Sequence, residues 1–328
     1  MRDRIGVVAI GRNEGERLAA CLRSLRTQGG EDLRAVYVDS GSTDQSVELA
    51  RSMDIGVEEL DMSIPFTAAR ARNAGFARLL DSWPNLEYVQ FIDGDCEMVA
   101  GWIEAATAFL DANPQTAVVC GHRRERYPER SVYNLLCDFD WDGPVGEVKA
   151  CGGDSVMRVS AFRGVSGFRD GLIAGEEPEL CVRLRQAGWQ IFRLDHEMCR
   201  HDAAMTRFGQ WWRRSERAGH AFAEGAWLHG RSPERHGARQ VASSVAWGFL
   251  LPVAVAVLVL AGFKGGIGLL LLYPIQVARI AVIGQRSTRE NWINALFLTI
   301  AKFAEFVGNS RFALNRLRRA PARLIEYK

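Results

Sequence analysis

The chain has 328 residues, of which 48% are hydrophobic and 24% charged, a balance typical of a folded protein and not of a disordered one. Its 41 basic and 39 acidic residues leave a net charge of +2, which gives no support for a nucleic-acid-binding protein. The length suggests about two structural units.

The N-terminus and the cysteines indicate the cellular compartment in which the protein folds. The apolar run at residues 5–10 is too short for a signal peptide, so we expect the first domain to stay in the cytosol. The 7 cysteines have irregular spacing and include no CxxC pair of the kind that holds zinc or does redox chemistry. Buried, reduced thiols are therefore predicted, in a reducing compartment.

Residues up to about Leu194 alternate short apolar runs with segments of helical period. Between the first two runs, Leu18, Leu22 and Leu25 fall on one helical face. This alternation predicts a mostly parallel α/β sheet, which binds ligands beyond the carboxyl ends of its strands. The apolar runs predicted to be strands are residues 5–10, 35–39, 88–93 and 116–120.

Asp39 ends the second predicted strand, and a small polar loop follows it as far as Asp44. A loop that caps the next helix accounts for Ser42, Thr43 and Asp44, but it leaves Asp39 unexplained. The Asp39 carboxylate is suited to accept hydrogen bonds from a nucleotide base or ribose. The sequence has no GxGxxG or Walker A pattern, so dinucleotide-binding and P-loop proteins lose their main support.

Asp93-Gly94-Asp95 follows the third predicted strand and is the sharpest feature of the sequence. Asp-Gly-Asp also occurs in ordinary turns. At the end of a buried strand, however, the two carboxylates can together face a divalent cation that bridges a diphosphate. Hard oxygen ligands of this kind suit Mg²⁺ or Mn²⁺.

A third group of residues comprises Cys151-Gly152-Gly153-Asp154 and a later acidic segment that starts at Glu176. Apolar spacing predicts a helix that begins near Pro178, so Glu176 and Glu177 would lie at its N-terminal mouth. Acidic residues there either complement the helix dipole or present a general base to a substrate hydroxyl.

The last third of the chain contains long apolar runs. Residues 241–263 form an uncharged apolar run long enough to cross a bilayer, and residues 267–283 are apolar except for Gln276 and Arg279. The short connection between them predicts a transmembrane hairpin. The alternative is a buried helical hairpin in a soluble protein.

A further apolar stretch at residues 292–307 contains Lys302 and Glu305, which are costly at the centre of a bilayer. We therefore expect this stretch to lie in the interface, followed by a basic tail on the cytosolic side. The tail contains Arg311, Arg316, Arg318, Arg319 and Arg323. Residues 206–240 mix tryptophan with arginine, which fits either interfacial helices or a helix packed on the catalytic domain.

The motifs together resemble the family-2 glycosyltransferases, which have a GT-A fold, over roughly residues 5 to 205. Five segments occur in the family's order: residues 7–14, residues 38–44, Ala71-Arg72-Asn73-Ala74-Gly75, Asp93-Gly94-Asp95, and residues 176–185. The resemblance implies a catalytic domain at 1–205, and the apolar and basic segments after it predict linker helices at 206–240 and a hairpin, interfacial helix and basic tail at 241–328.

The resemblance also implies a role for each matching residue. Asn13 and Glu14 would line the nucleotide pocket, Asp39 would contact the base, and Arg72 and Asn73 would lie near the donor. Asp93 and Asp95 would form the metal and diphosphate site, with His201 either a further metal ligand or a structural histidine. Gly152, Gly153 and Asp154 would border the acceptor. Glu177, beside Glu176, stands where the family usually has an aspartate that acts as the catalytic base, so its reach is longer.

These features predict an inverting, metal-dependent glycosyltransferase that uses a nucleotide-sugar and Mg²⁺ or Mn²⁺. Processive relatives carry Gln-x-x-Arg-Trp, whereas Gln210-Trp211-Trp212-Arg213-Arg214 lacks the final tryptophan, so we expect transfer of a single sugar. The hairpin favours a lipid-linked acceptor, such as a polyprenyl-linked sugar, and an inner-membrane enzyme that faces the cytoplasm. The alternatives are a nucleotidyltransferase, or a non-catalytic membrane scaffold with a degenerate transferase domain.

Overall fold

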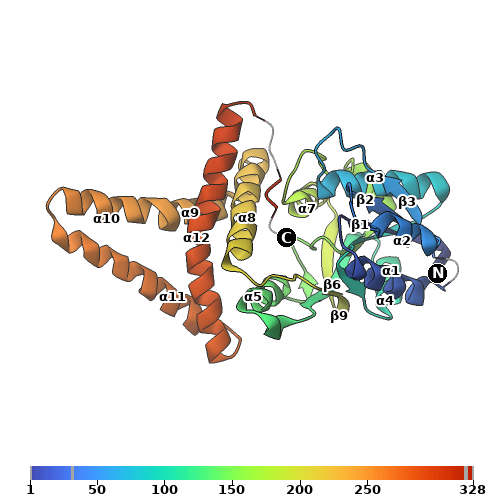
Figure 1. The fold of residues 1–328 in the computed structure, drawn as a ribbon, viewed down its shortest axis with the longest axis horizontal. Coiled ribbons are helices and arrows are strands. Elements are labelled where there is room, and N and C mark those ends of the chain that lie inside the picture. Colours follow the sequence, from blue (N-terminus) through green and yellow to red (C-terminus); the bar gives the residue numbers. More distant parts are fainter. Residues whose placement is uncertain (1, 31–32, 321–323, 327–328) are drawn as a thin grey trace. The chain divides into compact units, whose positions relative to one another are not determined.

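The computed structural model of this protein describes residues 2–30, 33–320 and 324–326. The chain divides into two compact units, Met1–Thr206 and Arg207–Lys328. Figure 1 shows the first as strands with surrounding helices and the second as helices.

Among the described residues of the first unit, nine strands form one mixed sheet with the order β3-β2-β1-β4-β8-β6-β9-β5, and β7 pairs with β9. Strands β3, β2, β1 and β4 run parallel, whereas β8 is antiparallel to both β4 and β6. The strands are β1 (Ile5–Gly11), β2 (Ala35–Asp39), β3 (Gly56–Glu59), β4 (Tyr88–Asp93), β5 (Cys96–Met98), β6 (Thr116–Glu125), β7 (Gly146–Glu147), β8 (Ser155–Arg158) and β9 (Gln190–His201).

Helices alternate with these strands, which confirms the predicted α/β, GT-A-like fold. They are α1 (Glu16–Gly29), α2 (Ser46–Ser52), α3 (Ala68–Ser82), α4 (Trp102–Ala112), α5 (Val132–Trp141), α6 (Val159–Gly164) and α7 (Glu176–Gln186), with 3₁₀ turns η1 (Arg2–Arg4) and η3 (Pro128–Arg130). Two boundaries differ from the prediction by more than one residue. Helix α7 begins at Glu176, because Gly175 adopts a left-handed conformation (φ 75°) as its N-cap, and β6 continues five residues past Cys120.

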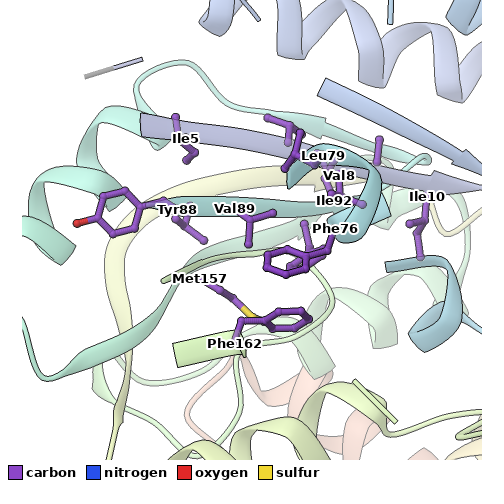
Figure 2. Close-up of a cluster of buried hydrophobic side chains, with 14 of the residues drawn as sticks. Ile5, Val8, Ile10, Phe76, Leu79, Tyr88, Val89, Ile92, Met157 and Phe162 are labelled. Carbon is purple, nitrogen blue, oxygen red and sulfur yellow. The ribbon is translucent and has the colours of Figure 1, made fainter. Parts of the chain in front are cut away.

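The core of the first unit lies on both faces of the parallel strands. Figure 2 shows Phe76 of α3 and Phe162 of α6 beside Val89 and Ile92 of β4. The two phenyl rings lie 4.6 Å apart at 60°, a favourable tilted arrangement. Strand β4 is buried along its length as far as Ile92, so Asp93 is held at the end of a rigid element.

The second unit contains helices α8 (Phe208–His229), α9 (Ala238–Val245), α10 (Leu251–Leu260), α11 (Leu272–Ile283) and α12 (Thr288–Leu317), with a π-helical turn η4 (Ala246–Leu250) and a 3₁₀ segment η5 (Lys264–Leu271). Helices α8 and α12 lie side by side (Figure 1). A β-carbon on Gly219 would lie 2.1 Å from the Glu305 carbonyl oxygen, so only glycine permits this close approach of the two backbones.

Two helices among the described residues are long and apolar enough to cross a membrane. They are Ala238–Leu260, which joins α9, η4 and α10, and Lys264–Ile283, which joins η5 and α11. Only 6% and 11% of the residues in their most apolar windows are buried within the structure. A helix from the core of a soluble protein would be mostly buried, so the exposed apolar surface disfavours a soluble hairpin.

The third apolar stretch belongs to α12, a 30-residue helix that starts with a capping box between Ser287 and Glu290. Its two internal charges pair with each other, since Lys302 Nζ lies 2.7 Å from Glu305 Oε2. Arg318 and Arg319 are exposed at its end, and Arg323 lies outside the described residues.

Candidate active site

The carboxyl ends of three parallel strands bring the predicted motifs to one edge of the sheet. Gly11 of β1 is paired with Asp39 of β2, and Ile10 of β1 is paired with Asp93 of β4. The loops that carry Asn13, Asp39 and Asp93 therefore start at neighbouring positions, where doubly wound sheets bind their ligands.

Asp39 is buried and organises its own loop. Its Oδ2 accepts the backbone N–H groups of Gly41 and Ser42 at 2.9 and 2.8 Å, while Tyr37 donates its hydroxyl to Oδ1 at 3.1 Å. Asn13, in a left-handed conformation (φ 55°), joins this loop to β1 because its Oδ1 accepts the N–H of Thr43 at 2.7 Å. The two predicted nucleotide-binding residues thus fix one continuous backbone surface.

Glu14 and Asn73 lie at the borders of this edge. Glu14 forms an ion pair with Arg17 at 2.8 Å. The Asn73 amide is used by a loop of the protein, since it donates to the Phe168 carbonyl at 2.8 Å and to Asp170 at 2.6 Å. Asn73 therefore anchors that loop, and its contact with a donor remains a prediction.

A buried arginine links the strand-end aspartate to the start of α7. Arg72 of α3 donates to Asp93 Oδ1 and to Glu176 Oε1, each at 2.7 Å. Its side chain is only 3% exposed. Although burial opposes the charge, Asp93 and Glu176 raise the pKa of Arg72, so the guanidinium stays charged.

A second arginine, Arg123 of β6, approaches the other oxygen of Asp93 at 3.2 Å. Its Nε lies 3.3 Å from Asp154, and its guanidinium lies over the Trp141 ring at 4.7 Å. The buried guanidinium of Arg72 and the half-buried guanidinium of Arg123 therefore flank Asp93. We did not predict Arg123 from the sequence, because it lies in the part of β6 beyond the apolar run.

The Cys151–Asp154 segment passes close to this charged cluster. Asp154 is buried, and its Oδ1 accepts the backbone N–H of Asp93 at 2.9 Å. A β-carbon on Gly153 would lie 2.7 Å from Arg72 Nη2 and 3.2 Å from Asp93 Oδ2. Asp154 and Gly153 therefore help to position Asp93. Their contact with an acceptor remains a prediction. Gly152 has a positive φ of 81°, and a β-carbon there would meet open space.

Asp95 and His201 form a separate buried pair. His201 Nε2 lies 3.2 Å from Asp95 Oδ2, and its Nδ1 lies 3.8 Å from Glu125 Oε2. Trp141 packs its ring edge-to-face with the imidazole at 4.5 Å. Burial, together with the nearby Arg123 charge, lowers the pKa of His201 from 6.5, which favours the neutral imidazole.

Glu177 follows Glu176 in the first turn of α7 and lies beside two thiols. Its Oε1 accepts the backbone N–H of Cys151 at 2.6 Å, the Cys181 thiol at 2.9 Å and the Cys151 thiol at 3.1 Å. No donor in the described part of the chain reaches its Oε2. Burial raises the pKa of Cys151 well above its usual range and that of Cys181 to about 12, so both thiols are protonated donors.

All seven cysteines are buried, as predicted, and none is paired in a disulfide in the structure. The Cys151–Cys181 pair was not foreseen, because the two residues are thirty positions apart and follow no metal-binding spacing.

The fold and this edge of the sheet define an α/β enzyme with acidic and basic side chains gathered beyond parallel strands. Residues 7–147 match the family model described as Glycosyl transferase family 2. This match lies within the N-terminal unit and indicates a glycosyltransferase domain there. The match ends before Glu176, Glu177 and His201.

Among curated proteins, the O-antigen chain rhamnosyltransferase RfbN of Salmonella typhimurium is 23% identical over 188 residues. The aligned part covers 53% of this chain and 58% of that relative's length.

Two solved structures share the fold. The mannosyltransferase PcManGT from Pyrobaculum calidifontis, solved with GDP-Man and Mn²⁺, is 20% identical and has a TM-score of 0.64, covering 94% of this chain and 87% of that one. Residues 1–349 of TarS from S. aureus are 16% identical with a TM-score of 0.52, covering 96% of this chain and 91% of that one.

Proposed function

We propose that this protein is an inverting, metal-dependent glycosyltransferase that moves one sugar from a nucleotide-diphosphate sugar to a hydroxyl of a lipid-linked acceptor. The observation that carries the proposal is the bridge from Asp93 through Arg72 to Glu176, with 2.7 Å contacts on both sides. It joins the end of the strand where a diphosphate would bind to the helix that presents the candidate base.

The residues at Asp95 fit a divalent cation. Two ligand atoms on adjacent corners of an octahedral Mg²⁺ site, each at about 2.1 Å, lie about 3.0 Å apart. Asp95 Oδ2 and His201 Nε2 lie 3.2 Å apart. The Glu125 carboxylate lies 3.8 Å from the other ring nitrogen, on the side where a metal-bound histidine commonly has a carboxylate partner. When bound, the ion would act as a Lewis acid that offsets negative charge on the departing nucleoside diphosphate.

The protein itself supplies further positive charge to the diphosphate. Arg72 and Arg123 are held in place by Asp93, so they need little reorganisation when the leaving group develops charge. We assign Asp93 the task of orienting these two guanidinium groups. The surface built by Asp39 and Asn13 would hold the nucleoside.

Glu177 is the proposed catalytic base. Because three donors hold Oε1, the carboxylate has a fixed orientation, and Oε2 is the atom to take the proton from the acceptor hydroxyl. The hydroxyl oxygen would attack the anomeric carbon from the side opposite the leaving diphosphate, which inverts the configuration. No covalent intermediate with the enzyme is required.

The two apolar helices support a membrane-bound acceptor. We propose that residues 1–205 are the catalytic domain, 206–240 an interfacial linker, and 241–328 a membrane hairpin followed by an interfacial helix. Exposed arginines at the end of α12 suit the anionic cytoplasmic leaflet, so the catalytic domain would face the cytoplasm of a bacterial inner membrane. The rhamnosyltransferase relative supports an acceptor on the route to a cell-surface polysaccharide.

The test is release of nucleoside diphosphate by the detergent-solubilised protein from a panel of nucleotide-sugars, with Mg²⁺ or Mn²⁺. We expect one donor to be turned over, with loss of release in EDTA and in Asp95→Ala. Pyrophosphate release with a nucleoside triphosphate would instead indicate a nucleotidyltransferase. No binding or turnover of any donor, even with membrane lipid extract added, would favour the scaffold.

A further inference from the structure

A second cluster of potential metal ligands lies around Glu177, apart from Asp95 and His201. Cys151, Glu177 and Cys181 each offer one ligand atom, and these atoms all lie within 4.8 Å of one another in the interior. In the described part of the chain, the polar contacts of the two thiols are with each other, Glu177, Gly152 and Ser155.

The geometry of the thiol pair matches a tetrahedral metal. The two sulfur atoms are 3.7 Å apart. Two thiolates on one tetrahedral zinc, each bonded at about 2.3 Å, would lie about 3.8 Å apart. The third ligand atom, Glu177 Oε1, lies 2.9 and 3.1 Å from the two sulfurs, and Ser155 Oγ lies 3.6 Å from Cys151 Sγ at a possible fourth corner.

The chemistry of this set differs from that of the Asp95 pair. Two thiols and one carboxylate select a soft or borderline cation such as Zn²⁺ and not Mg²⁺. A comparable group at Cys96, Asp154 and Cys199 is less suited, because Arg123 contacts both Cys96 and Asp154 and would repel a cation.

We propose that Cys151, Cys181 and Glu177 form an inhibitory site for Zn²⁺. Binding replaces the two thiol protons, which leave to the solvent, with one ion held by two thiolates and the Glu177 carboxylate. The ion would also withdraw charge from Glu177, so the carboxylate could no longer take a proton from the acceptor. This effect on catalysis rests on the proposed function, whereas the binding of the ion does not.

Binding is tested with the full-length, EDTA-treated protein in detergent, using Co²⁺ as a coloured substitute for Zn²⁺. We expect one thiolate-bound Co²⁺ per chain, distinct from an ion at Asp95 and His201, with a thiolate-to-cobalt absorption band that Zn²⁺ displaces. Cys181→Ser and Cys151→Ser should each abolish the band and weaken Zn²⁺ binding by more than about 100-fold. Cys137→Ser, at another buried cysteine, should keep both, and thermal melts would show that each variant is folded.

Three results would overturn the binding proposal: no band in the wild type, a band that survives both cysteine variants, or a band lost only in Cys199→Ser, which would locate the ion in the Cys96 cluster. A band that disappears in Asp95→Ala or His201→Ala would likewise assign the ion to the other site.

Inhibition is measured separately, as transfer with excess Mg²⁺ and rising Zn²⁺, relative to each variant's own activity without zinc. Wild type and Cys137→Ser should lose activity, whereas Cys181→Ser should keep its own level. Zinc binding without inhibition of the wild type would overturn the link to Glu177. If no donor is turned over at all, the proposed function fails, and the cobalt band still decides whether the site exists.

Discussion

Replacement of Gly153 by alanine tests whether the contact of Arg72 with Asp93 is part of the active site. The backbone of Gly153 is not left-handed, so alanine introduces no strain of its own there. Its β-carbon would lie 2.7 Å from Arg72 Nη2, whereas ordinary contacts begin at 3.4 Å. Because Nη2 is the atom that donates to Asp93 Oδ1 at 2.7 Å, the substitution must displace this contact.

The size of the effect follows from that displacement. A shift of about 0.7 Å would stretch the hydrogen bond to about 3.4 Å, where most of its strength is lost. A hydrogen bond to a charged group contributes about 1.5–3 kcal/mol. If the guanidinium acts on the diphosphate, we expect kcat/KM for donor turnover to fall by about 10- to 100-fold.

Gly171 and Gly152 serve as controls. Gly171→Ala adds a β-carbon in open space without a positive φ and should leave both activity and stability unchanged. Gly152→Ala also meets open space, but its φ of 81° should cost about 1–2 kcal/mol. It should therefore lower the melting temperature by several degrees. Nucleoside diphosphate release gives activity, and thermal unfolding gives stability.

The reasoning would be refuted if Gly153→Ala kept wild-type turnover with an unchanged melting temperature. That result would mean either that the loop adapts without moving Arg72 or that Arg72 does not act on the donor.

Three further predictions concern single side chains. His201→Ala should raise the Mn²⁺ concentration for half-maximal activity by at least about 10-fold, and an unchanged metal titration would exclude His201 as a ligand. Glu177→Gln should lower transfer by about 10²- to 10⁴-fold while donor binding, measured by calorimetry, stays within about 2-fold; retained transfer would remove Glu177 as the base. In α8, burial raises the pKa of Glu224 from 4.5 to about 7. The free energy of unfolding therefore falls by up to about 3 kcal/mol as the pH rises from about 4.5 through 7, because the buried carboxyl must then ionise in the folded state. Glu224→Gln should therefore melt higher than wild type at pH 8 and lose this advantage near pH 5, whereas parallel pH profiles would contradict the assignment.

Much of the sheet could be predicted because its central strands are buried on both faces and read as continuous apolar runs. Strands β2 and β4 have the predicted bounds, and β1 is one residue longer. The second half of β6 could not be predicted in this way. Its His122, Arg123 and Arg124 are polar because that part of the strand runs beside the charged residues of the candidate site, so hydrophobic periodicity is lost where the charged cluster begins.

The site could be predicted where chemistry and strand ends coincide. Asp39, Asp93 and the glutamates of α7 follow from motifs at the ends of elements. The partners that hold them do not follow, because contacts such as Arg123 with Asp93 or Cys151 with Cys181 depend on the antiparallel pairing of β8 between β4 and β6 and on the loop before it. Sequence spacing carries no information on those crossings.

The surroundings of Glu177 give a physical account of why a glutamate can stand where the family usually has an aspartate. An extra methylene would ordinarily give the carboxylate more reach and more freedom. Here one backbone N–H and two thiols hold Oε1, which limits both and leaves the second oxygen to accept a proton. The same thiols that would orient the base also make it accessible to soft metals. A relative without thiols at these two positions would lack the soft-metal site, so the proposed roles of Glu177, Cys151 and Cys181 are best understood together.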